Sequence, residues 1–146
     1  MKILVISLLF GALAGQTFEN KSDALDHLNN NNIWVAGMPN YTINENGEIG
    51  ITLDLNGKAL NYRFDVAKIE ADVKTIGSFT TVAISCDNGF CIQGTEGRSA
   101  IETDQVSLIM KSAFVKDDGS DEYKDQYPEK AAELVAAIEY IQKIYK

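Results

Sequence analysis

Two cysteines, Cys86 and Cys91, are the residues whose type and spacing best suit defined chemistry. Between them lies Asp-Asn-Gly-Phe, and Asn-Gly favours a two-residue type I′ hairpin loop because both central residues take positive φ. In such a hairpin the two cysteines face each other within disulfide reach. Zinc needs further ligands nearby, and the redox C-x-x-C spacing is absent. The spacing therefore predicts a structural disulfide between Cys86 and Cys91.

The other chemistry-bearing residues form no recognisable catalytic or metal-binding motif. His27 is the only histidine, so Ser-His or Cys-His catalysis would depend on it alone, and a solvated surface histidine is the simpler interpretation. The acidic run Asp117–Glu122 departs from the calcium-loop order because Gly119 comes too early. Residues 94–97 lack the lysine and the spacing of a phosphate-binding loop. We therefore expect no catalytic residue, no metal site and no cofactor.

The aromatic residues fall into two groups. Tyr123 and Tyr127 flank the end of the acidic loop, and tyrosine is enriched at protein interfaces, so these two are candidates for a contact surface. The others considered lie on predicted strands, where aromatic side chains more often pack into a core than bind a ligand. They are Trp34, Tyr41, Tyr62, Phe64, Phe79 and Phe90.

The elements that must position these residues are mostly strands, because apolar and polar residues alternate along much of the chain. Asn-Gly pairs at 46–47, 56–57 and 88–89 each predict a hairpin turn, so we expect an antiparallel meander. Seven strands are predicted, over Ile33–Asn44 (bent), Glu48–Leu55, Lys58–Val66, Phe79–Cys86, Phe90–Gln93, Ser99–Glu102 and Gln105–Phe114.

Helical periodicity is clearest at the C-terminus, over residues 128–145. Pro128 suits the first helical turn, and Leu134 and Ile141 belong to one apolar face. A helix with one apolar face must cover something, and the open end or face of the preceding sheet is the obvious place. Residues 66–77 are ambiguous, since they fit either a helix or a short connector that crosses between sheets.

The start of the chain has the features of an export signal. Lys2 precedes an apolar run over 3–13, and Ala12-Leu13-Ala14 has the small-x-small pattern of a signal-peptidase site. Gln16 stands where a lipidated cysteine would have to be, so a released protein is expected. Ser22 could cap a short helix that follows. The expected parts are a cleaved signal peptide at 1–14, a polar segment with a short helix at 15–32, and a single β-rich domain at 33–146.

Seven strands followed by one helix resemble the pleckstrin-homology-like fold. The stretch Ile84-Ser85-Cys86…Cys91-Ile92 and the ending Ala131-Ala132-Glu133-Leu134 also resemble small exported bacterial proteins of this fold, most of which have no assigned activity. The resemblance covers residues 33 to 145. It implies an antiparallel, partly open barrel of two sheets that the C-terminal helix plugs. A cystatin-like or lipocalin-like arrangement is the alternative.

The resemblance does not bring phosphoinositide binding with it. Lipid-binding members hold phosphates with basic residues around the first hairpin. Here that hairpin, residues 44–48, is Asn-Glu-Asn-Gly-Glu, which repels phosphate. We therefore expect no phosphoinositide membrane as a partner.

Charge narrows the function further. The chain has 21 acidic and 13 basic residues, for a net charge of −8. Loss of Lys2 with the signal peptide leaves 12 basic residues and a charge of −9. This sign disfavours nucleic acid and anionic membranes as partners. We expect a secreted or periplasmic, non-enzymatic binding module of unknown ligand, with a basic protein as a candidate partner. A secreted enzyme with an unrecognised carboxylate site is the alternative, and the oligomeric state stays open.

Overall fold

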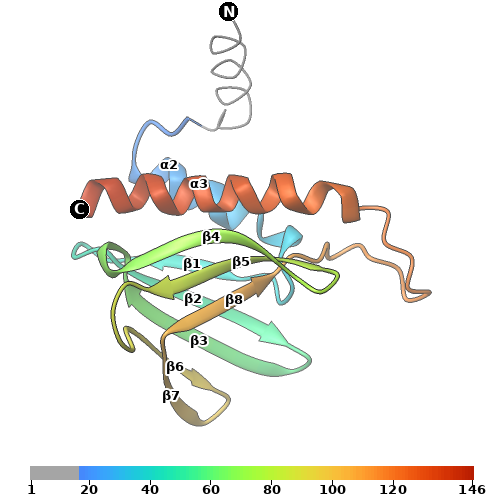
Figure 1. Cartoon of the computed structure of the whole chain (residues 1–146), viewed down its shortest axis with the longest axis horizontal. Coiled ribbons are helices and arrows are strands. Elements are labelled where there is room, and N and C mark those ends of the chain that lie inside the picture. Colours follow the sequence, from blue (N-terminus) through green and yellow to red (C-terminus); the bar gives the residue numbers. More distant parts are fainter. Residues whose placement is uncertain (1–16) are drawn as a thin grey trace, which may run out of the picture.

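Two antiparallel sheets face each other, and two helices lie along one side of them (Figure 1). The computed structural model describes residues 17–146, so the signal peptide expected at 1–14 lies outside the described part. The five-stranded sheet has the order β1-β2-β3-β6-β7 and the three-stranded sheet the order β4-β5-β8. Over residues 17–146 the sheets do not close into a barrel. The α+β class with a C-terminal helix is confirmed.

The α-helices are α2, Lys21–Asn30, and α3, Tyr127–Tyr145. The strands are β1 Asn40–Ile43, β2 Glu48–Leu55, β3 Lys58–Asp65, β4 Ile69–Ile76, β5 Phe79–Cys86, β6 Ile92–Glu96, β7 Ser99–Thr103 and β8 Gln105–Ile109. Single 3₁₀ turns are η1 Asn32–Trp34, η2 Val66–Lys68 and η3 Lys124–Gln126. Thus β2 and β5 have the predicted bounds, α3 begins one residue earlier than predicted, and β8 ends well before Phe114.

The ambiguous residues 66–77 contain an eighth strand, β4, which was not among the seven predicted. Asp65 caps the turn η2, because its carboxylate accepts the Ala67 N–H at 2.9 Å. After this turn β4 pairs with β5 along its whole length. Ile69, Val73 and Ile76 fit a helical spacing as well as they fit a strand, so local periodicity could not separate the two.

The predicted meander is present over β1, β2 and β3 but does not continue, because two of the three Asn-Gly pairs lie in hairpins and the third does not. Asn56 and Gly57, with φ of 55° and 80°, form the expected two-residue loop between β2 and β3. At 46–47 only Gly47 has positive φ, and the loop is longer, since the Asn44 N–H donates to Glu48 O at 3.1 Å. The pair at 88–89 forms no hairpin, since β5 and β6 belong to different sheets.

The bent strand predicted over Ile33–Asn44 is wrong in its first half. Its first two residues, Ile33 and Trp34, belong to η1, and Val35 makes only an isolated bridge, to Met110. Gly37 and Met38 then have φ of 83° and 44°. Such positive φ values break an extended run, so β1 begins only at residue 40.

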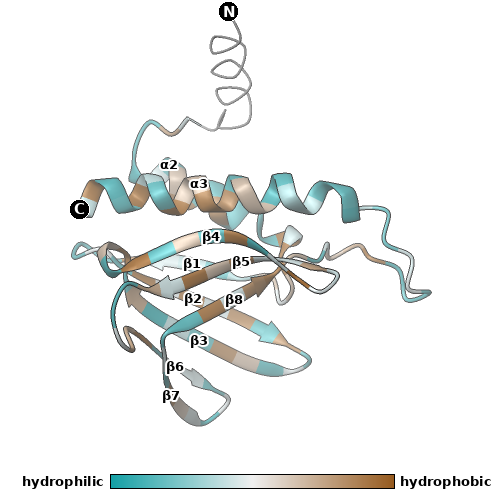
Figure 2. Ribbon diagram, in the orientation of Figure 1, coloured by the Kyte–Doolittle hydropathy of each residue, from teal (hydrophilic) through white to brown (hydrophobic). Residues whose placement is uncertain are grey.

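The two helices bury their apolar faces against the sheets and against each other (Figure 2). Asn20, and not the predicted Ser22, caps α2 by accepting the Asp23 N–H at 2.9 Å. In α3, Leu134, Ile138 and Ile141 are buried. Burial of each such side chain contributes about 1.5–3 kcal/mol before entropy is subtracted. The terminal helix therefore covers one open side of the sheets.

Three chain crossings between the two sheets meet at one corner. The chain leaves β3 for β4 through η2, returns from β5 to β6 through residues 87–91, and crosses again from β7 to β8 at Asp104. The disulfide between Cys86 and Cys91 lies in the second crossing, with Cα atoms 5.7 Å apart. The predicted disulfide is therefore present, but it links the ends of strands in two sheets and not the two arms of a hairpin.

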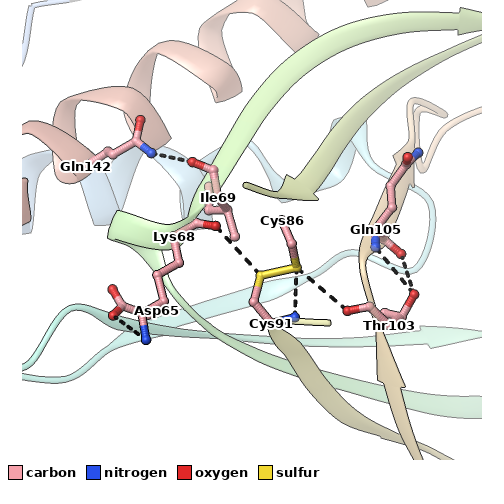
Figure 3. The surroundings of a disulfide bond; sticks show 8 residues. All are labelled: Asp65, Lys68, Ile69, Cys86, Cys91, Thr103, Gln105 and Gln142. Atoms are coloured by element: carbon pink, nitrogen blue, oxygen red, sulfur yellow. Dashed lines mark hydrogen bonds and ion pairs between the residues drawn. A yellow bond between two sulfur atoms is a disulfide. The ribbon is translucent and has the colours of Figure 1, made fainter. Parts of the chain in front are cut away.

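Contacts around this disulfide hold the crossings together, and Figure 3 shows the one between Cys91 Sγ and Lys68 O. The Asp87 N–H donates to Lys68 O at 2.9 Å, which ties the second crossing to the first. The Cys86 N–H donates to Asp104 O at 2.8 Å, which ties the second crossing to the third crossing. Cys91 Sγ lies 3.8 Å from Lys68 O. We call these three crossings and the disulfide the crossing corner.

Helix α3 also contacts the crossing corner. The amide of Gln142 donates to Val66 O at 3.0 Å and to Ile69 O, at the two ends of η2 (Figure 3 shows the second bond). These carbonyls would otherwise lack partners at the end of the turn. A single glutamine thus couples the terminal helix to the first crossing.

Replacing both cysteines (Cys86→Ser with Cys91→Ser) should lower the free energy of unfolding by about 2 kcal/mol, because a short covalent ring restricts the unfolded chain. The Cys86 and Asp87 amides should also exchange faster with solvent than in the native protein. Urea unfolding and hydrogen exchange measure the two effects. Phe90→Ala is the control, since Phe90 lies in the same loop and is 67% exposed. An unchanged unfolding midpoint in the double variant would contradict the role of the corner.

Candidate functional site

The side of the sheets away from the helices is open, between β7 and β8 (Figure 1). A groove of about 210 Å³ lies there, which we call the open seam. Five strands, β2, β3, β6, β7 and β8, line it. Its apolar lining is formed by Leu53, Leu55, Leu60, Tyr62, Ile101, Val106 and Leu108. The open seam is therefore an exposed margin of the same core that the helices cover on the other side.

Three acidic residues lie in or beside the strands that form the open seam. Glu102 is exposed on β7, and Asp104 is exposed in the crossing that joins β7 to β8. Glu96 lines the seam and is paired with Lys58 at 3.3 Å. Arg98, in the turn between β6 and β7, is a second exposed basic residue of this sheet end. Because Lys58 pairs with Glu96, the named residues leave a small acidic excess beside the seam, with the same sign as the charge of the whole chain.

A second hollow, of about 700 Å³, lies on the polar outer face of the five-stranded sheet. The strand register places a row of residues side by side across it: Thr42, Gly50, Arg63, Gln93 and Glu102. Gly50 leaves room there, since a β-carbon on it would lie 2.6 Å from Thr42 Oγ1. Glu102 is the one carboxylate that lines this hollow. Paired carboxylates of the kind used in glycoside hydrolysis do not line it.

The acidic run borders a third groove, of about 860 Å³, between the β4–β5 turn and the loop after β8. Asp117, Asp121 and Asp125 line it together with Lys111 and Lys124. Across residues 17–146, no three His, Cys, Asp or Glu side chains come close enough to hold a metal ion.

His27 is not the solvated surface residue that was expected. It belongs to α2, and its half-buried side chain faces α3. Its Nε2 is buried without a hydrogen-bond partner and lies 4.0 Å from Glu133 Oε2. The Phe18 ring packs on it, with centroids 5.4 Å apart. Burial lowers the pKa of His27 below its ordinary value of 6.5, and Lys130 adds to this effect, while Glu133 and Asp23 oppose it.

Two buried tyrosines differ in how their hydroxyls are satisfied. Tyr127 accepts the Ser112 N–H at 2.8 Å and donates to Asp121 Oδ2 at 2.9 Å, so the predicted contact surface at Tyr127 is wrong. Tyr41 is 2% exposed, and its hydroxyl has no hydrogen-bond partner. Burial accordingly raises the pKa of Tyr41. Leaving such a hydroxyl unpaired costs stability.

The other aromatic predictions give a mixed result. Tyr123 is partly buried and packs edge-on against the partly buried Trp34, with centroids 5.8 Å apart. Tyr62 and Phe64 are buried, as predicted. Phe79 and Phe90 are 57% and 67% exposed, because both lie in or beside turns, and their assignment to the core is wrong.

No protein-family model, no curated protein and no solved structure matches this chain. Of the helices between residues 17 and 146, none is both long and apolar enough to cross a membrane. A function for this chain therefore has to be inferred from the shape, charge and burial of its own residues.

Tyr41→Phe should leave the free energy of unfolding unchanged or raise it by about 1 kcal/mol, because it removes an unpaired buried hydroxyl. Tyr127→Phe is the matched comparison and should lower that energy by about 1–3 kcal/mol, since it strands the Ser112 N–H. Urea unfolding of both variants measures the difference. Equal losses would show that the Tyr41 hydroxyl has a partner.

Lowering the pH from 7.5 to about 5 should destabilise the protein through His27. The pKa of His27 is lower in the folded chain, so the unfolded chain binds the proton more tightly, and the free energy of unfolding falls as pH drops below 6.5. His27→Gln should reduce this dependence. Urea unfolding of both proteins across the pH range provides the measurement, and identical pH profiles would refute the assignment.

Proposed function

We propose that this chain is an exported, non-enzymatic binding module that engages a cationic protein. The observation that carries the proposal is the open seam, an uncovered margin of the core. The strand β7 beside it carries the exposed Glu102 on its outer face, and Asp104 is exposed in the crossing that follows. Apolar surface next to one sign of charge is typical of a protein-interaction site. A basic partner would meet complementary charge at the seam and on the acidic chain as a whole.

Two observations support export. The disulfide between Cys86 and Cys91 is of the kind that persists in secreted or periplasmic proteins and is rare in the cytosol. The sequence pattern over 1–14 is that of a signal peptide. A secreted or periplasmic location is therefore part of the proposal.

The proposed fold is pleckstrin-homology-like, as in the small exported bacterial proteins that the sequence resembles. Two facing antiparallel sheets and a terminal helix along one open side support it. The strand number, eight instead of seven, and the three crossings are features that this assignment has to accommodate. The absence of basic residues from the loop 44–48 argues against phosphate binding at the first hairpin.

The enzyme alternative has one observation in its favour. Three aspartates, at 117, 121 and 125, line the groove beside the acidic loop. However, Asp121 already accepts the Tyr127 hydroxyl, which gives it a structural role. If the chain were an enzyme of this kind, Asp117→Asn with Asp125→Asn would abolish turnover without unfolding it.

Association with a cationic partner should weaken by about tenfold or more between 50 mM and 500 mM NaCl, because the attraction is electrostatic and salt screens it. The bait is the chain without residues 1–14, and the native extracellular fraction is the source of the partner. Isothermal titration with the purified partner measures the affinity at each salt concentration. An acidic protein of similar size serves as the control. Binding of the cationic partner that is undiminished at high salt would contradict the proposal.

A further inference from the structure

Strand edges of this protein differ in how far their backbone groups are covered, and β1 is the clearest case of protection. The Asn29 side chain, from α2, lies against this edge. Its Oδ1 accepts the Tyr41 N–H at 2.8 Å, and its Nδ2 donates to Tyr41 O at 3.0 Å. One amide side chain therefore takes the place of a neighbouring strand at this residue, which blocks pairing with another chain.

The edges of the three-stranded sheet are also partly covered. Helix α3 runs along β4 (Figure 1), where Gln142 donates to Ile69 O. On β8, the Ala36 N–H donates to Ile109 O at 2.9 Å. The Thr103 hydroxyl donates to Gln105 O at 3.2 Å.

Strand β7 is the opposite case. Along an antiparallel strand, successive residues direct their N–H and C=O groups to opposite neighbouring strands. Because the Gly97 N–H donates to Ala59 O, the odd-numbered residues of β6 bond to β3 and the even-numbered ones bond to β7. Residues 99, 101 and 103 therefore face β6, and the N–H and C=O groups of Ala100 and Glu102 point away from the sheet. Among residues 17–146, no hydrogen bond to these four groups is formed.

We propose that the free edge of β7 binds an extended basic segment of a partner protein by strand addition. The inference rests on the proposed function, because it specifies how the cationic partner is held. Four backbone hydrogen bonds, two to Ala100 and two to Glu102, would extend the five-stranded sheet by one strand. The open seam lies next to this edge and receives the side chains that point inward.

Side-chain positions on β7 define the chemistry of the added segment. Ile101 points to the inner face, toward the apolar lining of the open seam, so inward positions of the added strand would be apolar. Glu102 lies on the outer face, and Asp104 follows directly, so outward positions would be basic. The added segment therefore alternates apolar and basic residues.

A second copy of this chain is the competing occupant of the edge. Two β7 strands that use the same four groups would pair antiparallel about Ile101, which places Glu102 opposite Ala100 and Asp104 opposite Arg98 of the other chain. Local charge does not forbid this pairing, but two chains that each have a net charge of −8 repel each other. The net charge therefore favours a basic partner over self-association.

Heptapeptides of alternating lysine and valine test the inference directly. The unmodified peptide should bind the oxidised protein and shift the amide resonances of Ala100 and Glu102. N-methylation of the lysine backbone nitrogens should weaken binding by about tenfold, and N-methylation of the valine nitrogens should not, because only alternate N–H groups face β7. A glutamate–valine peptide is the charge control. Equal effects of the two methylations, or no binding of the unmodified peptide, would overturn strand addition.

Three variants locate the contact on the protein. Ala100→Pro removes a free N–H of β7 without touching the bonds to β6, and it should weaken peptide binding about tenfold. Glu102→Lys should do the same by reversing the local charge, whereas Glu70→Lys, which makes the same change on exposed β4, should not. Thermal unfolding checks that each variant is folded.

The outcomes also separate this inference from the proposed function. If the native partner still binds Ala100→Pro and Glu102→Lys normally and in a salt-sensitive way, strand addition at β7 is wrong and the binding function stands. If no cationic protein binds the native chain, the proposed function itself fails. A dimer in solution that Ala100→Pro dissolves would identify a second copy as the occupant and overturn the choice of a basic partner.

Discussion

The covalent bond between Cys86 and Cys91 is the constraint on which the arrangement of the sheets depends. It lies where the chain passes three times from one sheet to the other, and main-chain hydrogen bonds from Cys86 and Asp87 tie the other two passages to it. Neither sheet is a continuous stretch of sequence, so both take their strands from before and after this corner. The corner therefore fixes how the two sheets face each other and, with that, where the core is left uncovered.

An asymmetry of the core follows from this arrangement. Helices α2 and α3 cover one margin of the facing sheets, whereas no helix within residues 17–146 covers the margin between β7 and β8. The short connection at Asp104 forces β7 and β8 into different sheets directly after one another, so they separate instead of pairing. The same crossing that completes the corner thus creates the open seam.

Local features of the chain could be predicted from the sequence, and long-range ones could not. Strands β2 and β5 and helix α3 were predictable because each carries its own periodicity. The two cysteines were predictable from their spacing, but the predicted hairpin was wrong because strand pairing depends on partners far along the chain. The open seam had no sequence signal, since five strands contribute to its lining. The role of Asn29 had no sequence signal either, because nothing in the sequence distinguishes a solvent-exposed asparagine on a helix from one that hydrogen-bonds the edge of a strand.

The packing of α3 has a consequence for how folding proceeds. Gln142 reaches back to Val66, and the pairs β3–β6 and β5–β8 also join strands far apart in sequence. Such contacts form slowly, because long loops must close first. Helix α3 follows every strand in the chain, so during synthesis the strands emerge before the helix that covers them. Until α3 has been made, the apolar margin that it covers is exposed to water and prone to aggregation.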